Sequence, residues 1–151
     1  MILSKESLMF QIAPLQESDL PRFTELWNQG YAVLTSKQRV MTVEKAHEGF
    51  TAALFTYVGI RNDAQELVGF LLLKEDNTTV WIMHMLVDQH WRGKGIGGKL
   101  VLEAKHRARM AGKKVAAEVL WVNRAAKSFY TSRPKPHAEA CGWRPIRCLL
   151  E

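Results

Sequence analysis

The sequence predicts an α/β (α+β) fold in which a mixed, mostly antiparallel central sheet carries helices on both faces. Segments with strand-like and helix-like patterns follow one another in the order β-α-α-β-β-β-α-β-α-β. Three of these strands are consecutive, as in a meander, and a buried strand is followed by a glycine-rich loop and an amphipathic helix. No repeat or linker interrupts the chain, so we expect a single domain spanning residues 1–151.

The N-terminal third is predicted to contain one strand and two helices. Residues 9–15 alternate loosely between apolar and polar side chains, which indicates a strand. Ser18 or Asp19 can cap the first helix, and Gly30 can end it. Thr42 can cap the second helix, which has apolar residues at helical spacing. We expect these to face inward: Val43, Ala46, Phe50, Ala53 and Leu54.

The middle of the chain is predicted to form the meander. Strands 55–60 and 66–74 are joined by a hairpin loop at 61–65, and the polar turn 75–78 leads into a third strand at 80–87. The remaining predicted elements are a helix from Ile96 to about Gly112, a strand at 115–122, a short helix from Asn123 and a last strand at 143–150.

Residues 80–98 are the most informative stretch of the sequence. Residues 80–87 are almost entirely apolar, with His84 as the one polar side chain, so we expect a strand that is covered on both faces. The following loop and helix start contain four glycines within six residues, at 93–98. From Ile96 onward, apolar residues recur at helical spacing.

This glycine-rich loop is predicted to bind an anion. Glycine permits positive φ and lets a ligand approach the backbone N–H groups closely. The helix N-terminus that follows adds unpaired N–H groups and the positive end of the helix dipole. Arg92 and Lys94 add positive charge. A strand–helix turn alone could require one glycine, but four glycines flanked by two cations favour a phosphate or pyrophosphate site.

A dinucleotide-binding site is the first alternative for this loop. Gly93-x-Gly95-x-x-Gly98 formally matches the dinucleotide fingerprint, and Glu118 lies at a suitable distance downstream. However, residues 88–92 separate the strand from the first glycine, and only 33 residues follow Glu118. The chain is therefore too short for such a domain, and without a Gly-Lys-Ser/Thr sequence it has no P-loop.

A second match is more specific. Arg92-x-x-Gly95-x-Gly97, preceded by Leu-Val-Asp at 86–88, resembles motif A of the GNAT superfamily of N-acetyltransferases. Residues 119–130 resemble a second block of the family, a strand followed by Asn-x-x-Ala-x-x-Phe-Tyr. The resemblance implies that the loop amides hold the pyrophosphate of acetyl-CoA, and that the pantetheine arm lies between strands 80–87 and 115–122. The implied cofactor-binding residues are Met85, Leu86, Val87, Arg92, Gly93, Lys94, Gly95, Ile96, Gly97, Gly98, Asn123 and Tyr130.

The same resemblance suggests the residues that carry the chemistry. Tyr130 matches the family's acid for the leaving thiolate, and Glu118 matches the general base of the bacterial ribosomal-protein N-terminal acetyltransferases. His84 is a further candidate base, because its reference pKa suits proton transfer. Structural readings remain open: a paired carboxylate for Glu118, a core histidine for His84 and a packed aromatic for Tyr130. Family members often carry a glutamate on the strand where this sequence has Met83, His84 and Met85.

The implied activity is transfer of an acetyl group from acetyl-CoA, as co-substrate and without a metal, to a primary amine of a small molecule, peptide or protein. A non-catalytic acyl-CoA-binding sensor is the alternative, favoured by the missing strand glutamate. The net charge of +6 suits a polyanionic ligand. A nucleic-acid partner is not expected, because no helix-turn-helix or zinc-ligand spacing is present. A homodimer is left open.

Composition also limits the cellular context. No apolar run approaches the roughly 18–20 residues of a membrane span, so no membrane partner is expected. Cys141 and Cys148 are the only cysteines, and without a secretion signal they are expected to be free thiols in the cytoplasm. Residues 131–141 depart from the family pattern and contain Pro134 and Pro136, which break a helix. We expect this insertion to be an exposed loop.

Overall fold

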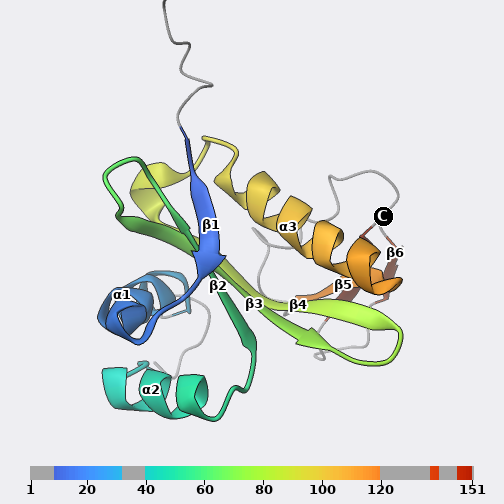
Figure 1. The fold of residues 1–151 in the computed structure, drawn as a ribbon, viewed down its shortest axis with the longest axis horizontal. Coiled ribbons are helices and arrows are strands. Elements are labelled where there is room, and N and C mark those ends of the chain that lie inside the picture. The colour runs from blue at the N-terminus through green and yellow to red at the C-terminus, as the bar shows by residue number, and fades with distance from the viewer. Residues whose placement is uncertain (1–8, 32–39, 120–136, 140–145, 151) are drawn as a thin grey trace, which may run out of the picture. The chain divides into compact units, whose positions relative to one another are not determined.

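The computed structural model describes residues 9–31, 40–119, 137–139 and 146–150 (Figure 1). The chain forms two compact units: Met1–Leu71 with Met85–Leu100, and Leu72–His84 with Val101–Glu151. Strands β3 (Leu67–Glu75) and β4 (Thr79–Val87) and helix α3 (Ile96–Ala111) each contribute to both units.

The first unit contains the N-terminal elements in the predicted order. Its sheet order is β1-β2-β3-β4, and β1 pairs antiparallel with β2 from Gln11↔Arg61 to Pro14↔Val58. Figure 1 shows α1 beside α2 in this unit. The elements that precede β3 are β1 (Gln11–Pro14), a 3-10 turn η2 (Glu17–Asp19), α1 (Leu20–Tyr31), α2 (Val43–Thr51) and β2 (Thr56–Arg61).

The helix caps of the first unit are partly as predicted. The Thr42 side chain accepts a hydrogen bond from the backbone N–H of Lys45 at 3.2 Å, which confirms Thr42 as the cap of α2. Asp19 instead closes the 3-10 turn, where its carboxylate accepts from the backbone N–H of Gln16 at 2.8 Å. Helix α1 begins at Leu20, directly after this 3-10 turn.

The predicted inward face of α2 is wrong at three positions. Val43 is 41% exposed and Leu54 is 53% exposed. Ala53, with φ of 50°, also lies beyond the end of the helix at Thr51 and is exposed. The helical spacing of apolar residues continues in the sequence to Leu54, but the helix ends at Thr51. The pattern therefore predicted more buried residues than the helix has. Only Ala46 is fully buried, at 3% exposure.

Strand β3 runs through the cores of both units, and its residues 67–71 belong to the first. Every residue from Leu67 to Leu73 is buried, so both faces of this strand are covered. On one face, Phe70 packs against Phe23 of α1 with ring centroids 4.6 Å apart. Trp27, one turn further along α1, stacks on Phe70 at 6.2 Å with an interplanar angle of 9°. Helix α1 is thus held on this face of the sheet by aromatic contacts.

The second unit contains the parallel part of the sheet. Its strand order is β3-β4-β5-β7-β6, with β5 (Lys114–Val119), β6 (His137–Glu139) and β7 (Ile146–Leu150). β4 pairs parallel with β5, whereas β5 with β7 and β6 with β7 are antiparallel. The prediction of a mixed, mostly antiparallel sheet is confirmed.

Helix α3 has the predicted apolar stripe and the predicted end. Its buried residues recur at helical spacing, as expected for a helix packed on a sheet. Gly112 follows the helix at φ of 68°. The backbone N–H of Gly112 donates to the carbonyl of Arg109 at 3.1 Å, and the N–H of Lys113 donates to the carbonyl of Ala108 at 2.8 Å. Together these two bonds form a Schellman motif. The buried stripe comprises Ile96, Leu100, Val101, Ala104 and Ala108.

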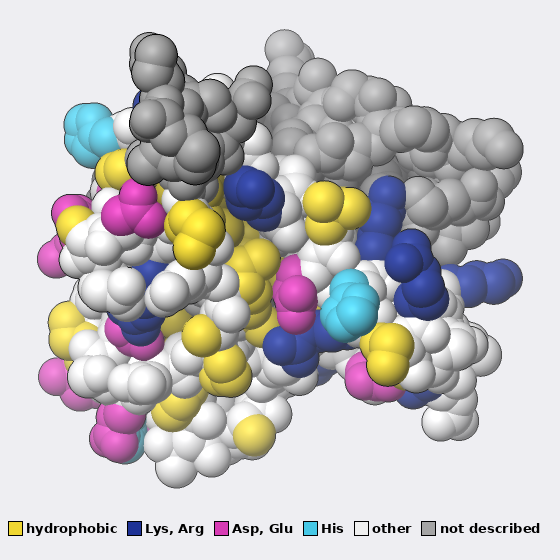
Figure 2. All heavy atoms as spheres, turned by 45° about the horizontal axis from the view of Figure 1, so that its top comes forward, with side chains coloured by type: hydrophobic (Ala, Val, Ile, Leu, Met, Phe, Trp, Pro, Cys, Tyr) yellow, Lys and Arg dark blue, Asp and Glu magenta, His cyan; other side chains and the backbone are white. Residues whose placement is uncertain are grey.

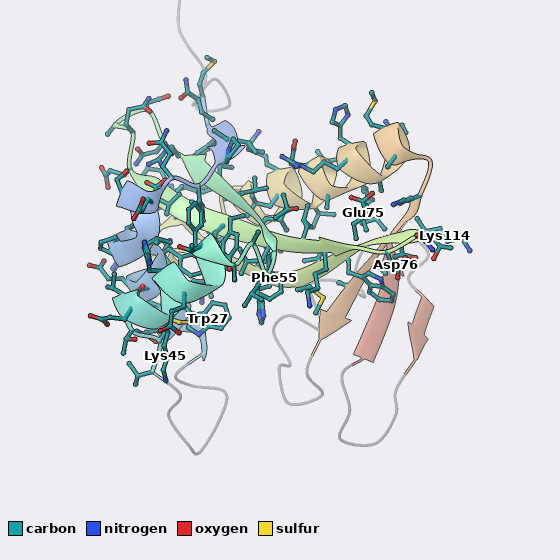
Figure 3. All side chains as sticks on the ribbon, turned by 60° about the horizontal axis from the view of Figure 1, so that its bottom comes forward. Trp27, Lys45, Phe55, Glu75, Asp76 and Lys114 are labelled. Carbon is teal, nitrogen blue, oxygen red and sulfur yellow. The ribbon has the colours of Figure 1, made fainter. Side chains whose placement is uncertain are left out.

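The turn between β3 and β4 is closed by Asp76. Its carboxylate accepts from the backbone N–H groups of Thr78 and Thr79 and from Nε1 of Trp81, each at 2.8 Å. These bonds, that of Trp81 foremost, lower the pKa of Asp76 to about 2. Figure 3 shows Glu75, Asp76 and Lys114 together at this end of the hairpin. The predicted polar turn at 75–78 is confirmed.

Two further predictions are corrected by the structure. Strand β4 is not covered on both faces: Val80, Ile82 and Leu86 are buried, but the alternate residues from Trp81 to Val87 are only half-buried. The insertion at 131–141 is not simply a loop, because it contains β6, which pairs with β7 from His137↔Leu149 to Glu139↔Arg147. The prolines break a helix but leave these three residues free to pair as a strand.

No helix in the described part of the chain has the length and apolar character needed to cross a membrane.

Candidate functional site

The glycine-rich loop belongs to the first unit and connects β4 to α3. β4 ends at Val87, and Asp88 caps a 3-10 turn, η3 (Gln89–Trp91). The carboxylate of Asp88 accepts from the N–H of His90 at 2.9 Å, and its carbonyl accepts from the N–H of Trp91 at 2.8 Å. The predicted order of strand, loop and amphipathic helix is confirmed.

Two of the four glycines are required by the backbone conformation. Gly93 has φ of 79° and Gly95 has φ of 80°, both in the left-handed region. A Cβ added at either position would meet no atom of the described part of the chain within 4 Å. Packing therefore does not explain these glycines, and the space above the backbone is open. A ligand can approach the main chain at this point.

The start of α3 leaves backbone donors available. The first intrahelical hydrogen bond runs from the N–H of Lys99 to the carbonyl of Gly95 at 3.1 Å, so Gly95 occupies the N-cap position. Glycine has no side chain that could accept from the N–H groups of the first turn. The N–H groups of residues 96–98 thus point out of the helix N-terminus, where an anion is favoured by hydrogen bonds and by the helix dipole.

Two cations of the loop, Arg92 and Lys94, precede this helix terminus in the sequence, and each makes a contact with a neighbouring residue. Arg92 donates from Nε to the carbonyl of Val87 at 3.2 Å. Nζ of Lys94 lies 5.9 Å from the ring centroid of Trp91, within the range of a cation–π contact. Arg92, Lys94 and Lys99 are all exposed. Figure 2 shows Lys and Arg side chains on the surface that α3 forms.

Asp88 anchors the start of the loop, and the sequence patterns did not reveal this role. It is 4% exposed, and its backbone N–H donates to the carbonyl of Val68 at 2.8 Å. Its carboxylate also pairs with Nη2 of Arg22. Burial alone would raise the pKa of Asp88, but the N–H of His90 and the guanidinium of Arg22 outweigh it and hold the pKa below its usual value.

His84 lies on β4 in the second unit and is partly buried. Burial lowers the pKa of this imidazole from 6.5 to about 4, so His84 is neutral at physiological pH. A neutral imidazole can accept a proton, but a pKa of about 4 makes it a weak base near pH 7.

The other predicted chemical residues are described only in part. Glu118 lies on β5, where its backbone is in register with Arg147 of β7. Asn123 and Tyr130 lie outside the described residues, and so does most of the second family block, from 120 to 130.

The end of β4 has a feature that the pattern missed. Leu86 packs so closely against Gly30 of α1 that a Cβ at Gly30 would overlap its Cδ1 atom. The shared register of β4 and β5 ends at the pair Ile82↔Ala117, while β4 continues to Val87 and β5 to Val119.

Among the described residues, no group of three or more His, Cys, Asp and Glu side chains is arranged to hold a metal ion.

Comparisons with known proteins identify a family model and solved structures that this chain resembles. The family model described as "Acetyltransferase (GNAT) family" matches residues 12–133. A search of curated proteins gives no match. Among solved structures, the PaiA N-acetyltransferase of Thermoplasma acidophilum in complex with coenzyme A aligns with a TM-score of 0.78 at 19% identity, covering 95% of this chain and 99% of that one.

Two other structures have the same fold. An acetyltransferase of Thermus thermophilus aligns with a TM-score of 0.75 at 20% identity, covering 94% of this chain and 96% of that one. A ribosomal-protein-alanine N-acetyltransferase of Brucella melitensis aligns with a TM-score of 0.71 at 18% identity, covering 92% and 97%.

Proposed function

The chain belongs to the acetyltransferase (GNAT) family, and from this premise we propose that its glycine-rich loop holds the pyrophosphate of acetyl-CoA for acetyl transfer to an amine. The observation that carries the proposal is the start of α3: a glycine N-cap, left-handed Gly93 and Gly95, and open space above both. A pyrophosphate needs several backbone donors at close range, and a side chain at the N-cap would take some of them.

The rest of the cofactor is assigned to the strands. Met85, Leu86 and Val87 form the end of β4, beyond the register that β4 shares with β5. We assign the pantetheine arm to this segment, because its amide groups can pair with a strand edge. Asn123 and Tyr130 are proposed contacts further along the chain, on the strength of the family pattern alone.

The proposed reaction is a direct transfer. The amine nitrogen attacks the thioester carbonyl carbon, an N–C bond forms, and the C–S bond breaks. Glu118 takes the proton that the amine loses, and Tyr130 protonates the leaving thiolate of coenzyme A. His84 stays in the set as a second candidate base, with the low pKa as an argument against it.

The acceptor is proposed as a primary amine of a small molecule, peptide or protein. The fold likeness to a ribosomal-protein-alanine N-acetyltransferase supports a peptide amine as one class to test. A single domain and a cytoplasmic location remain predictions from composition, and a homodimer stays open. The competing function is a non-catalytic acyl-CoA sensor, which Met83, His84 and Met85 favour by replacing the glutamate expected on this strand.

The test measures cofactor binding and turnover separately. Acetyl-CoA should raise the melting temperature, because a ligand that binds the folded state stabilises it by mass action, whereas NAD should not. Release of free thiol is then followed with a panel of small amines and N-terminal peptides. Thiol release with any amine supports the enzyme. Stabilisation by acetyl-CoA without turnover on the whole panel would support the sensor, and stabilisation by NAD alone would contradict the acetyltransferase site.

A further inference from the structure

A buried ion pair lies at the start of the glycine-rich loop. Asp88 is 4% exposed and is the first residue after β4. A buried carboxylate is costly unless its charge is paired and hydrogen-bonded. Both conditions are met here, because the N–H of His90 and Nη2 of Arg22 donate to it. The pair joins residues 66 positions apart in the sequence.

Arg22 connects three elements with one guanidinium group. From α1, its Nε donates to the carbonyl of Leu67 at the start of β3 at 3.1 Å, and its Nη2 donates to Asp88. Its Nη1 pairs with Glu25 at 3.0 Å on the exposed side of α1. The planar fork of arginine can make the first two bonds at once, which the single ammonium of lysine does less well.

Within the loop, the described contacts are the bond from Arg92 to the carbonyl of Val87 and the contact of Lys94 with the Trp91 ring. Residues 92–95 are exposed, and the Cβ positions of Gly93 and Gly95 face open space. Their backbone direction is therefore set at the two ends of the loop. At the far end, the hydrogen bond from Lys99 to Gly95 starts α3. At the near end, Asp88 sets the direction of the backbone. It is joined by hydrogen bonds to Arg22 of α1, to Val68 of β3 and to His90 of η3.

We propose that Arg22 and Asp88 are positioning residues for the cofactor: they hold the loop so that its N–H groups converge on the pyrophosphate. This inference rests on the proposed pyrophosphate site. Neither residue is assigned a contact with acetyl-CoA, and both act through the loop. Since small displacements of binding groups have large effects, loosening this end should weaken acetyl-CoA binding far more than it changes the chemical step.

The test compares two variants at the pair. Asp88→Asn removes the negative charge, and Arg22→Gln removes the guanidinium group that bonds to Leu67 and Asp88. Each should raise the KM for acetyl-CoA by about 10- to 100-fold, while kcat at saturating acetyl-CoA changes less than about threefold. Arg22→Lys keeps the charge and one bond, so its KM should fall between those of the wild type and Arg22→Gln. If Asp88→Asn does not fold, the Arg22 series decides the question.

A second ion pair of the same unit provides the matched control. Asp19 is 7% exposed, pairs with Arg61 and accepts from a backbone N–H, that of Gln16, but it lies in η2, away from the loop in sequence. Asp19→Asn should lower the melting temperature as Asp88→Asn does and leave the KM for acetyl-CoA unchanged. Equal KM values in the Asp19→Asn and Asp88→Asn variants would overturn the inference.

A shortened acetyl donor distinguishes a loss of loop positioning from a general loss of structure. S-acetylpantetheine lacks the pyrophosphate, so kcat/KM with this donor should be the same in Asp88→Asn and the wild type. An equal loss with both donors would mean a general structural effect and would overturn the inference. Gly95→Val, measured in parallel, tests the site itself. If this variant loses acetyl-CoA affinity and Asp88→Asn does not, the inference fails and the site stands. If Gly95→Val binds normally, the proposed site fails.

Discussion

The backbone N–H of Lys99 donates to the carbonyl of Gly95 at 3.1 Å, so α3 begins on a residue that has no side chain. An ordinary N-cap side chain would accept a hydrogen bond from the first turn of the helix. In this helix, no side chain at the N-cap accepts from the backbone N–H groups of the first turn. These groups remain available to a ligand, next to Arg92 and Lys94 in the sequence. The helix gives up the stability of a side-chain cap, typically about 1 kcal/mol, at the place where the family pattern assigns the pyrophosphate.

Gly95→Val should abolish acetyl-CoA binding without unfolding the protein. Valine is strained at φ of 80°, which should lower the free energy of unfolding by about 1 to 2 kcal/mol. A Cβ at this position meets no atom of the described residues within 4 Å, so the substitution should cause no clash at Cβ. Isothermal titration with acetyl-CoA and circular dichroism are the measurements.

Gly112→Val is the matched control for this substitution. Gly112 has φ of 68°, also has open space at its Cβ, and lies just past the other end of α3. This variant should lose similar stability and keep its acetyl-CoA affinity. A loss of affinity in both variants would point to damage of the helix and not of the loop.

His84 should make the protein less stable as the pH falls below neutral. Its pKa is about 4 in the folded protein and 6.5 in the unfolded chain, so between these values the unfolded state binds more protons. The free energy of unfolding therefore falls as the pH is lowered from about 6.5 to about 4. For a partly buried group, we expect roughly 1 to 2 kcal/mol of loss from this residue between pH 7 and pH 5.

Urea unfolding at pH 7 and pH 5 measures this effect. His84→Asn should reduce the difference between the two pH values, because the titrating group is gone. His106, which is exposed on α3, provides the control: His106→Asn should retain the pH dependence of the wild type. An unchanged pH dependence in His84→Asn would show that the instability comes from other groups.

Tyr130→Phe should lower turnover by about 100-fold and leave acetyl-CoA affinity nearly unchanged. The substitution removes one hydroxyl, and protonation of the thiolate occurs mainly in the transition state. Tyr57→Phe is the control, because Tyr57 packs among Phe23, Phe50 and Phe55 and also loses only a hydroxyl. Wild-type turnover in Tyr130→Phe, measured by thiol release, would remove the acid assignment.

Glu118→Gln should slow the reaction most at neutral pH and least at alkaline pH. A free amine needs no base once the medium has deprotonated it, so higher pH should restore part of the rate. The measurement is kcat/KM between pH 6 and pH 10, in the variant and in the wild type. A loss of the same size at every pH would indicate a structural carboxylate in place of a base.

Local features of the fold could be predicted because each depends on a few neighbouring residues. Thr42 was predicted as a cap from its place before an apolar helical pattern, and its side chain makes the capping bond. The loop after β4 was predicted from glycines, which adopt the positive φ values of Gly93 and Gly95 without steric cost. Predictions that extended a pattern, such as the inward face of α2 through Leu54, failed where the helix ended.

The sequence by itself determined the strand–loop–helix unit, the mixed sheet and the family, because glycine conformation, capping and apolar periodicity are properties of short segments. Only the tertiary structure decided that Arg22 pairs with Asp88, that Leu86 packs against Gly30, and that residues 137–139 join β7 as a strand. The physical reason is separation along the chain. An ion pair or a strand pairing depends on which distant segment folding brings into contact, and no local pattern encodes that choice.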